Sequence, residues 1–105
     1  GYGGSFFKNP IITKVHLDEL LATYGELRYF PQPNGEYKIA LGWVLDKICG
    51  LRGYCDGDVC LSQHQALVLL NHGDSATAVV QFVTDVQTAV YKKTKINIEP
   101  EVRFV

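Results

Sequence analysis

Hydrophobic side chains recur every three or four residues in three stretches of the chain, which is the spacing of an amphipathic helix. Gly25 and Gly50 follow the first and second stretches, as glycine does after many helices. Asp74 or Ser75 precedes the third stretch and is suited to cap its first turn. The sequence therefore predicts three helices, with apolar positions at Leu17, Leu20, Leu21 and Tyr24, at Leu41, Val44, Leu45 and Ile48, and at Val79, Phe82, Val83, Val86 and Val90.

Between these stretches the pattern changes to that of strands and turns. Residues 36–39 alternate between polar and apolar side chains and follow Asn34-Gly35, a pair typical of a tight hairpin turn. Residues 66–70 are a continuous apolar run of strand length, which is expected to be buried on both faces. Residues 51–63 carry two glycines and two aspartates and are predicted to be irregular.

Two prolines interrupt the extended segments near the ends of the chain. Pro10 divides residues 6–12, and Pro100 separates the strand-like residues 96–98 from 102–105. The elements do not alternate as strand, helix and strand, and no glycine-rich phosphate loop accompanies them, which argues against a doubly wound dinucleotide fold. The pattern predicts a small two-layer α+β domain, with about three helices packed on a small, mostly antiparallel sheet.

The composition narrows the class of protein. A length of 105 residues suits one domain, and a hydrophobic content of 47% excludes a disordered chain. The net charge of −1 shows no excess of positive charge of the kind that binds nucleic acid or a membrane surface. No apolar run reaches the roughly 18 residues that a membrane-spanning helix needs. Methionine is absent and the chain ends on a strand-like segment, so we expect a domain of a longer protein.

The cysteines and histidines do not form a zinc motif. Cys49, Cys55 and Cys60 are an odd number, and without a secretory signal we expect them to be reduced thiols. Cys55, Cys60, His64 and His72 include ligand types for zinc, but four residues separate the two cysteines and no CxxC pair is present. No metal site is predicted.

Residue types alone leave the function open. Ser62, His64 and Asp74 have the chemistry of a hydrolase triad, but no nucleophile elbow surrounds the serine. Ser5 follows two glycines and has the composition of a solvated linker. Glu101 near the chain end is typical of an acid on a solvent-facing edge strand.

Motifs at both ends of the chain carry a more specific signal. Residues 4–10 read Gly-Ser-Phe-Phe-Lys-Asn-Pro, and residues 99–104 read Glu-Pro-Glu-Val-Arg-Phe. Further motifs lie between them at residues 30–32, 42–46 and 65–71. In order and spacing these motifs resemble the C-terminal domain of the UDP-N-acetylenolpyruvoylglucosamine reductase family, over essentially the whole chain.

The resemblance implies a cytoplasmic flavoenzyme of peptidoglycan precursor synthesis. Such an enzyme reduces the enolpyruvyl double bond of UDP-N-acetylglucosamine enolpyruvate, with NADPH as electron source and FAD as carrier. Residues 1–105 would be its C-terminal substrate-binding domain, and the FAD-binding domains would lie N-terminal to it. We expect the isolated domain to be inactive, to bind neither FAD nor NADPH tightly, and to have no nucleic-acid or membrane partner.

The resemblance also implies roles for five residues. Ser5 would donate a proton to C2 of the enolpyruvyl group after hydride reaches C3, and Glu101 would be the second catalytic group. Asn9 and Gln65 would contact the diphosphate of the nucleotide, and the cationic Lys8 beside Asn9 is a further candidate for phosphate. Because Ser5 and Glu101 serve one carbon, their side chains are expected within roughly 10 Å of each other. The N-terminal segment should then run beside the C-terminal one.

A non-catalytic module that binds a nucleotide sugar or another protein on the same scaffold is the alternative. The presence of both Ser5 and Glu101 argues against it, because a decayed site has no chemical reason to keep both. The chain also departs from the family pattern at residues 56–62. Relatives have a glycine- and alanine-rich stretch that ends in Val-His, whereas this chain has acids, a thiol and a final serine there.

Overall fold

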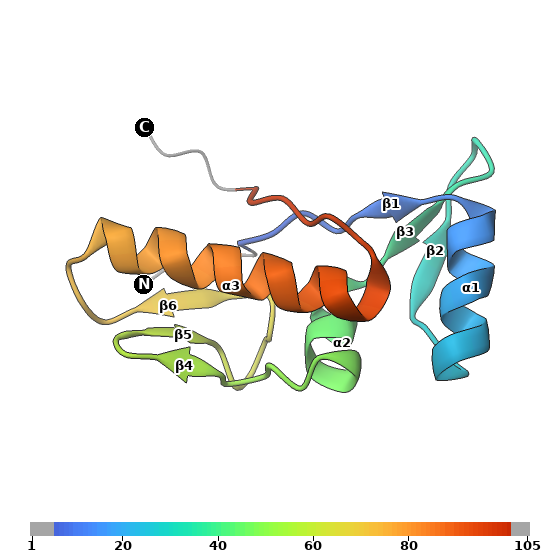
Figure 1. The fold of residues 1–105 in the computed structure, drawn as a ribbon. Coiled ribbons are helices and arrows are strands. Elements are labelled where there is room, and N and C mark those ends of the chain that lie inside the picture. The colour runs from blue at the N-terminus through green and yellow to red at the C-terminus, as the bar shows by residue number, and fades with distance from the viewer. Residues whose placement is uncertain (1–5, 102–105) are drawn as a thin grey trace.

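A computed structural model of the chain describes residues 6–101. The α+β class is confirmed, and the strands are divided between two small antiparallel sheets, in the orders β1-β3-β2 and β4-β5-β6. Figure 1 shows α3 lying across the second sheet and α1 beside the first. Along the chain the described elements are β1 (Ile11–Ile12), α1 (Lys14–Tyr24), β2 (Tyr29–Pro31), β3 (Tyr37–Ile39), α2 (Leu41–Trp43), the π-helical turn η1 (Val44–Ile48), β4 (Cys55–Asp56), β5 (Val59–Leu61), β6 (Leu69–Asn71) and α3 (Ala76–Thr94).

The predicted hairpin joins β2 to β3, but its turn is centred one residue earlier than expected. The N–H of Gly35 donates to the carbonyl of Gln32 at 3.2 Å, so the central residues are Pro33 and Asn34. Proline suits the first central position because its φ is fixed, and Gly35 takes the left-handed position that follows, with a φ of +84°. The N–H of Gln32 then donates to the carbonyl of Glu36 at 2.8 Å, which closes the hairpin.

Helix α1 is capped at both ends and is tied to the end of α3. The side chain of Thr13 accepts a hydrogen bond from the N–H of His16, and Gly25 ends the helix with a φ of +80°. Because Thr13 is the cap, His16 lies within the first turn of the helix. Its Nε2 atom lies 2.6 Å from the carbonyl oxygen of Thr94 at the C-terminal end of α3.

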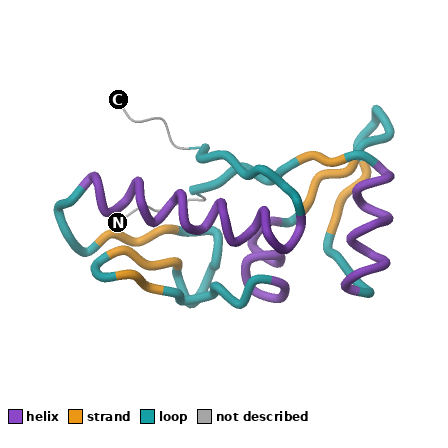
Figure 2. Tube along the Cα trace, in the orientation of Figure 1, coloured by secondary structure: helices purple, strands orange, loops and turns teal. Residues whose placement is uncertain are grey.

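The second predicted helix is a short α2 that continues into the π-helical turn η1. The N–H of Cys49 donates to the carbonyl of Val44 at 3.0 Å, five residues back, which is the spacing of a π-helix. The apolar positions of this stretch that face the core, Leu41, Val44 and Leu45, are fully buried. Figure 2 shows these two elements as one purple segment between the two sheets.

The second sheet contains the segment that was predicted to be irregular. β4 and β5 form a hairpin across Gly57 and Asp58, with Cys55 directly opposite Cys60. The expectation of reduced thiols is wrong for this pair, because the register brings them together as a disulfide with Cα atoms 4.0 Å apart. Of the three cysteines, all in the described part, Cys49 is free and half-buried.

Two predicted strands are shorter or absent. The apolar run 66–70 contributes only Leu69 and Leu70 to β6, because a turn at the start of the run returns the chain toward β5. Residues 96–98 are not a strand in the structure, although Ile96 and Ile98 are buried. Residues 102–105, the other strand expected there, lie outside the described residues.

The core is one cluster that joins α3, the second sheet and both end segments of the described chain to buried residues of α1, β1, β3, α2 and η1. Phe6 and Phe7 are fully buried, with their rings packed edge to face at a centroid distance of 5.1 Å. Every predicted core position of α3 is buried, and Ser75 caps the helix by accepting a hydrogen bond from the N–H of Ala78 at 3.1 Å. The helix therefore fixes the sheet and the end segments relative to one another.

Candidate functional site

Three segments that are distant in sequence meet at Phe6. The N–H of Phe6 donates to the carbonyl of Leu67 at 3.0 Å, and the carbonyl of Phe6 accepts from the N–H of Glu101 at 2.7 Å. Further along, the N–H of Lys8 donates to the carbonyl of Glu99 at 2.9 Å. The expected course of the N-terminal segment beside the C-terminal one is therefore confirmed for residues 6–8 and 99–101, and Figure 1 shows the two running together.

Of the two residues expected to be catalytic, the structure describes only Glu101. Glu101 is exposed, and its backbone is held by Phe6. Ser5 precedes Phe6 in the sequence but lies outside the described residues, so its distance from Glu101 stays a prediction.

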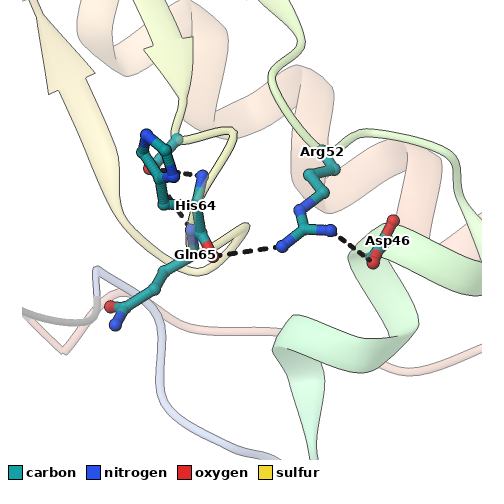
Figure 3. A network of polar contacts seen from close by, with 5 residues as sticks. Asp46, Arg52, His64 and Gln65 are labelled. Atoms are coloured by element: carbon teal, nitrogen blue, oxygen red, sulfur yellow. Dashed lines mark hydrogen bonds and ion pairs between the residues drawn. The ribbon is translucent and has the colours of Figure 1, made fainter.

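The loop that joins β5 to β6, residues 62–68, carries Gln65 and is folded by its own hydrogen bonds. The N–H of Ser62 donates to the carbonyl of Val68 at 2.8 Å, and the N–H of Val68 donates to the carbonyl of Gln65 at 2.9 Å. The Oγ atom of Ser62 also accepts from the N–H groups of His64 and Gln65, at 3.1 and 3.3 Å. Figure 3 shows the exposed Gln65 side chain extending away from Arg52.

Arg52 holds the outside of this loop. Its Nη2 atom donates to the carbonyl of His64 at 3.2 Å, and its Nη1 atom lies 3.6 Å from a carboxylate oxygen of Asp46 in η1 (Figure 3). The Arg52 side chain is 49% exposed, so the ion pair is screened by water and contributes little to stability. A groove of about 510 Å³ lies here, with a lining that includes Arg28, Trp43, Lys47, Arg52 and Gln65.

Asn9 and Lys8 lie farther along the N-terminal segment. The Oδ1 atom of Asn9 accepts a hydrogen bond from the N–H of Leu41 at 3.1 Å and so satisfies the first residue of α2. Lys8 is exposed, and both residues line a second groove, of about 530 Å³, together with Glu99. The structure therefore brings the loop of Gln65 and the backbone of Glu101 to the same junction, and it places Asn9 and Lys8 in a separate groove.

Two residues that shape this junction, Ser62 and Arg52, were not predicted from the sequence to have this role. Ser62 was weighed only as a nucleophile, and its Oγ atom instead accepts two backbone hydrogen bonds. Arg52 was not singled out. A serine whose oxygen bonds to N–H groups two and three residues later is a known local motif, so the first of these was open to prediction from sequence.

The described part of the chain has neither a cluster of metal ligands nor a membrane-spanning helix. Among residues 6–101, no three His, Cys, Asp or Glu side chains are arranged to hold a metal ion. Within the same residues, no helix combines the length and the hydropathy needed to cross a membrane.

Comparison with known proteins identifies the family. The family described as UDP-N-acetylenolpyruvoylglucosamine reductase, C-terminal domain, matches residues 1–105. The chain is 42% identical to UDP-N-acetylenolpyruvoylglucosamine reductase of Pasteurella multocida, over 100% of the chain and 31% of that protein. It is 41% identical to the protein of that name from Pectobacterium atrosepticum, over 100% of the chain and 30% of that protein. The chain thus spans about 30% of the length of these relatives, and it belongs to the family of UDP-N-acetylenolpyruvoylglucosamine reductase C-terminal domains.

Proposed function

We propose that this chain is the substrate-binding and proton-donating domain of a cytoplasmic, NADPH-dependent flavoenzyme that reduces UDP-N-acetylglucosamine enolpyruvate to UDP-N-acetylmuramate. The family supports the reaction, because the relatives are named as reductases of the enolpyruvyl sugar. The observation that carries the proposal for this domain is the junction at Phe6, which holds the loop of Gln65 on one side and the backbone of Glu101 on the other.

The described residues do not include the phosphate-binding loop of a dinucleotide fold. They contain no glycine-rich loop that leads from a strand into a helix, and the N–H of Ala78 in the first turn of α3 is already bonded to the side chain of Ser75. In the proposal FAD and NADPH are therefore held by other domains of the intact enzyme, and this chain supplies the acid.

The proposed chemistry of this chain is a proton transfer. Addition of hydride to C3 of the enolpyruvyl group leaves carbanion character at C2, which must be protonated. The hydroxyl of Ser5 donates this proton, and the carboxylate of Glu101 assists the same step. A serine hydroxyl is a weak acid, but a carbanion is a strong enough base to take its proton.

The amide groups of Asn9 and Gln65 are proposed to orient the diphosphate of the substrate. The Oδ1 atom of Asn9 accepts the hydrogen bond from the N–H of Leu41. Its NH₂ group is the part of the amide that donates to a phosphate oxygen. Neutral donors suit a domain with a net charge of −1, and the exposed ammonium group of Lys8 adds one positive charge.

Single-turnover kinetics of the intact enzyme test this proposal. The enzyme is reduced with one equivalent of NADPH and mixed with UDP-N-acetylglucosamine enolpyruvate, and the reoxidation of the flavin is followed. Ser5→Ala and Glu101→Gln are each expected to slow this step by about 10²-fold or more, because each removes one group from the proton transfer. Flavin reduction by NADPH should keep its rate.

Glu99→Gln is the matched control, since it changes an acid two residues away with the same loss of charge. Reoxidation at the wild-type rate in both catalytic variants would contradict the proposal. Tight binding of the sugar nucleotide by the intact protein without any turnover would favour the non-catalytic alternative.

A further inference from the structure

Ser62 is a buried serine at the base of the loop that carries Gln65. It is 9% exposed, and its Oγ atom accepts the N–H groups of His64 and Gln65 at 3.1 and 3.3 Å. These two N–H groups have no other bond within the loop, whereas the backbone of Ser62 is separately paired with Val68. The side chain therefore fixes the turn independently of the strand pairing.

The direction of Gln65 depends on this turn. Its own N–H is bonded to Ser62 and its carbonyl accepts from the N–H of Val68, so both of its backbone polar groups are fixed. Arg52 holds the preceding carbonyl, that of His64, from outside the loop (Figure 3). Because its backbone is already fixed, Gln65 has only its side-chain torsions left to order when its amide binds a ligand, and the backbone part of the entropy cost is avoided.

The same loop also orients the N-terminal segment. The carbonyl of Leu67, two residues after Gln65, accepts the N–H of Phe6. A loosened turn would therefore disturb the amide of Gln65 first and the anchor of Phe6 next.

We propose that Ser62 is a positioning residue, which presents the amide of Gln65 to the diphosphate of the sugar nucleotide without touching the substrate itself. The proposal rests on the function proposed above for Gln65 and goes beyond it by assigning what holds that residue in place. It predicts that the effect of Ser62 on substrate affinity passes through Gln65 and vanishes when Gln65 is absent.

Calorimetric titration of the oxidised, intact enzyme with UDP-N-acetylglucosamine enolpyruvate, without NADPH, measures the affinity free of turnover. Ser62→Ala is expected to raise the Kd about three- to tenfold. Ser62→Thr keeps the accepting oxygen and should restore most of the affinity. In the double variant Ser62→Ala/Gln65→Ala, the Kd should equal that of Gln65→Ala alone, because the two residues act as one unit.

Ser75→Ala is the matched control. Ser75 makes the same kind of bond, to the N–H of Ala78 at 3.1 Å, but at the start of α3, so its loss should lower the melting temperature and leave the Kd unchanged. An unchanged Kd in Ser62→Ala, or effects of Ser62→Ala and Gln65→Ala that multiply in the double variant, would overturn the positioning role while the proposed function stands. Failure of the wild-type enzyme to bind the substrate, or of Gln65→Ala to weaken it, would contradict the proposed function or its assignment of Gln65.

Discussion

The carbonyl oxygen of Phe6 accepts a hydrogen bond from the N–H of Glu101 at 2.7 Å, so residues 95 positions apart in the chain are bonded neighbours. The side chain of Phe6 is fully buried and packs against Phe7, which anchors this junction in the core. Its N–H is bonded to the loop of Gln65 through Leu67. One buried aromatic residue thus couples the stability of the domain to the geometry proposed for its substrate site.

Phe6→Ala is therefore expected to lower the free energy of unfolding by about 3–5 kcal/mol, because it leaves a cavity where a fully buried ring was. Chemical denaturation followed by circular dichroism measures this value. Phe30→Ala is the control, since that ring is 49% exposed and its loss should change stability by less than about 1 kcal/mol. Equal effects of the two substitutions would contradict the anchoring role of Phe6.

The periodicity of α1 and α3, the glycine that ends α1 and the cap that begins α3, which depend on local sequence, were predicted correctly. The apolar stripe of α3, from Val79 to Val90, is buried as its spacing indicates, and Ser75 is one of the two predicted caps. Gly25 ends α1 in the left-handed conformation expected of a glycine there. In each case the evidence lies within a few residues, because helix periodicity and capping are local properties.

Features that depend on register or on contacts between distant segments were not predicted from the pattern of residues alone. The pairing of Cys55 with Cys60 follows from the hairpin register, which their spacing alone does not reveal. Residues 65–68 turn instead of extending, because backbone bonds between Ser62, Gln65 and Val68 compete with the strand. The meeting of the two end segments was expected only from the resemblance, since hydrophobic periodicity says nothing about which segments lie side by side.

Asn9 is expected to have two separable roles. Asn9→Ala removes the acceptor for the N–H of Leu41 and should lower the free energy of unfolding by about 0.5–2 kcal/mol. The same substitution should also weaken substrate binding. Asn9→Asp keeps an acceptor and should keep the stability, but it places a negative charge where the diphosphate is proposed to bind. Thermal unfolding and calorimetric titration of the same two variants separate these effects. Wild-type substrate affinity in Asn9→Asp would rule out a phosphate contact for Asn9.

The thiol of Cys49 is expected to react slowly and with a shifted pH dependence. Burial raises its pKa above the ordinary value for cysteine, and the nearby positive charge of Lys93 partly opposes this shift. The rate of alkylation by iodoacetamide, measured under non-reducing conditions, should reach its midpoint at a higher pH than for a free cysteine. Lys93→Ala should move the midpoint higher still.

The same shift affects stability with a definite sign. A raised pKa means that the folded state keeps its proton at a pH where the unfolded state has lost it, so the folded state binds more protons. The stability that this provides is complete below the unfolded pKa and is lost as the pH rises through the folded value. Unfolding at a series of alkaline pH values should show this decline in the wild type and a smaller one in Cys49→Ala. Identical dependence of stability on pH in the two proteins would contradict a contribution from Cys49.

The disulfide between Cys55 and Cys60 is expected to be a modest stabilising link in the second sheet. The two cysteines are five positions apart, so the closed loop is short, and chain entropy gives a stabilisation of about 2 kcal/mol for a loop of that size. Alkylation followed by mass spectrometry should modify one cysteine in the denatured, non-reduced protein and all three after treatment with dithiothreitol. Cys55→Ser/Cys60→Ser should unfold at a lower denaturant concentration than wild type in the absence of reductant and should match it in the presence of reductant. Three alkylated cysteines before reduction would show that the pair is not joined in solution, and the register of β4 against β5 would then depend on the backbone bonds alone.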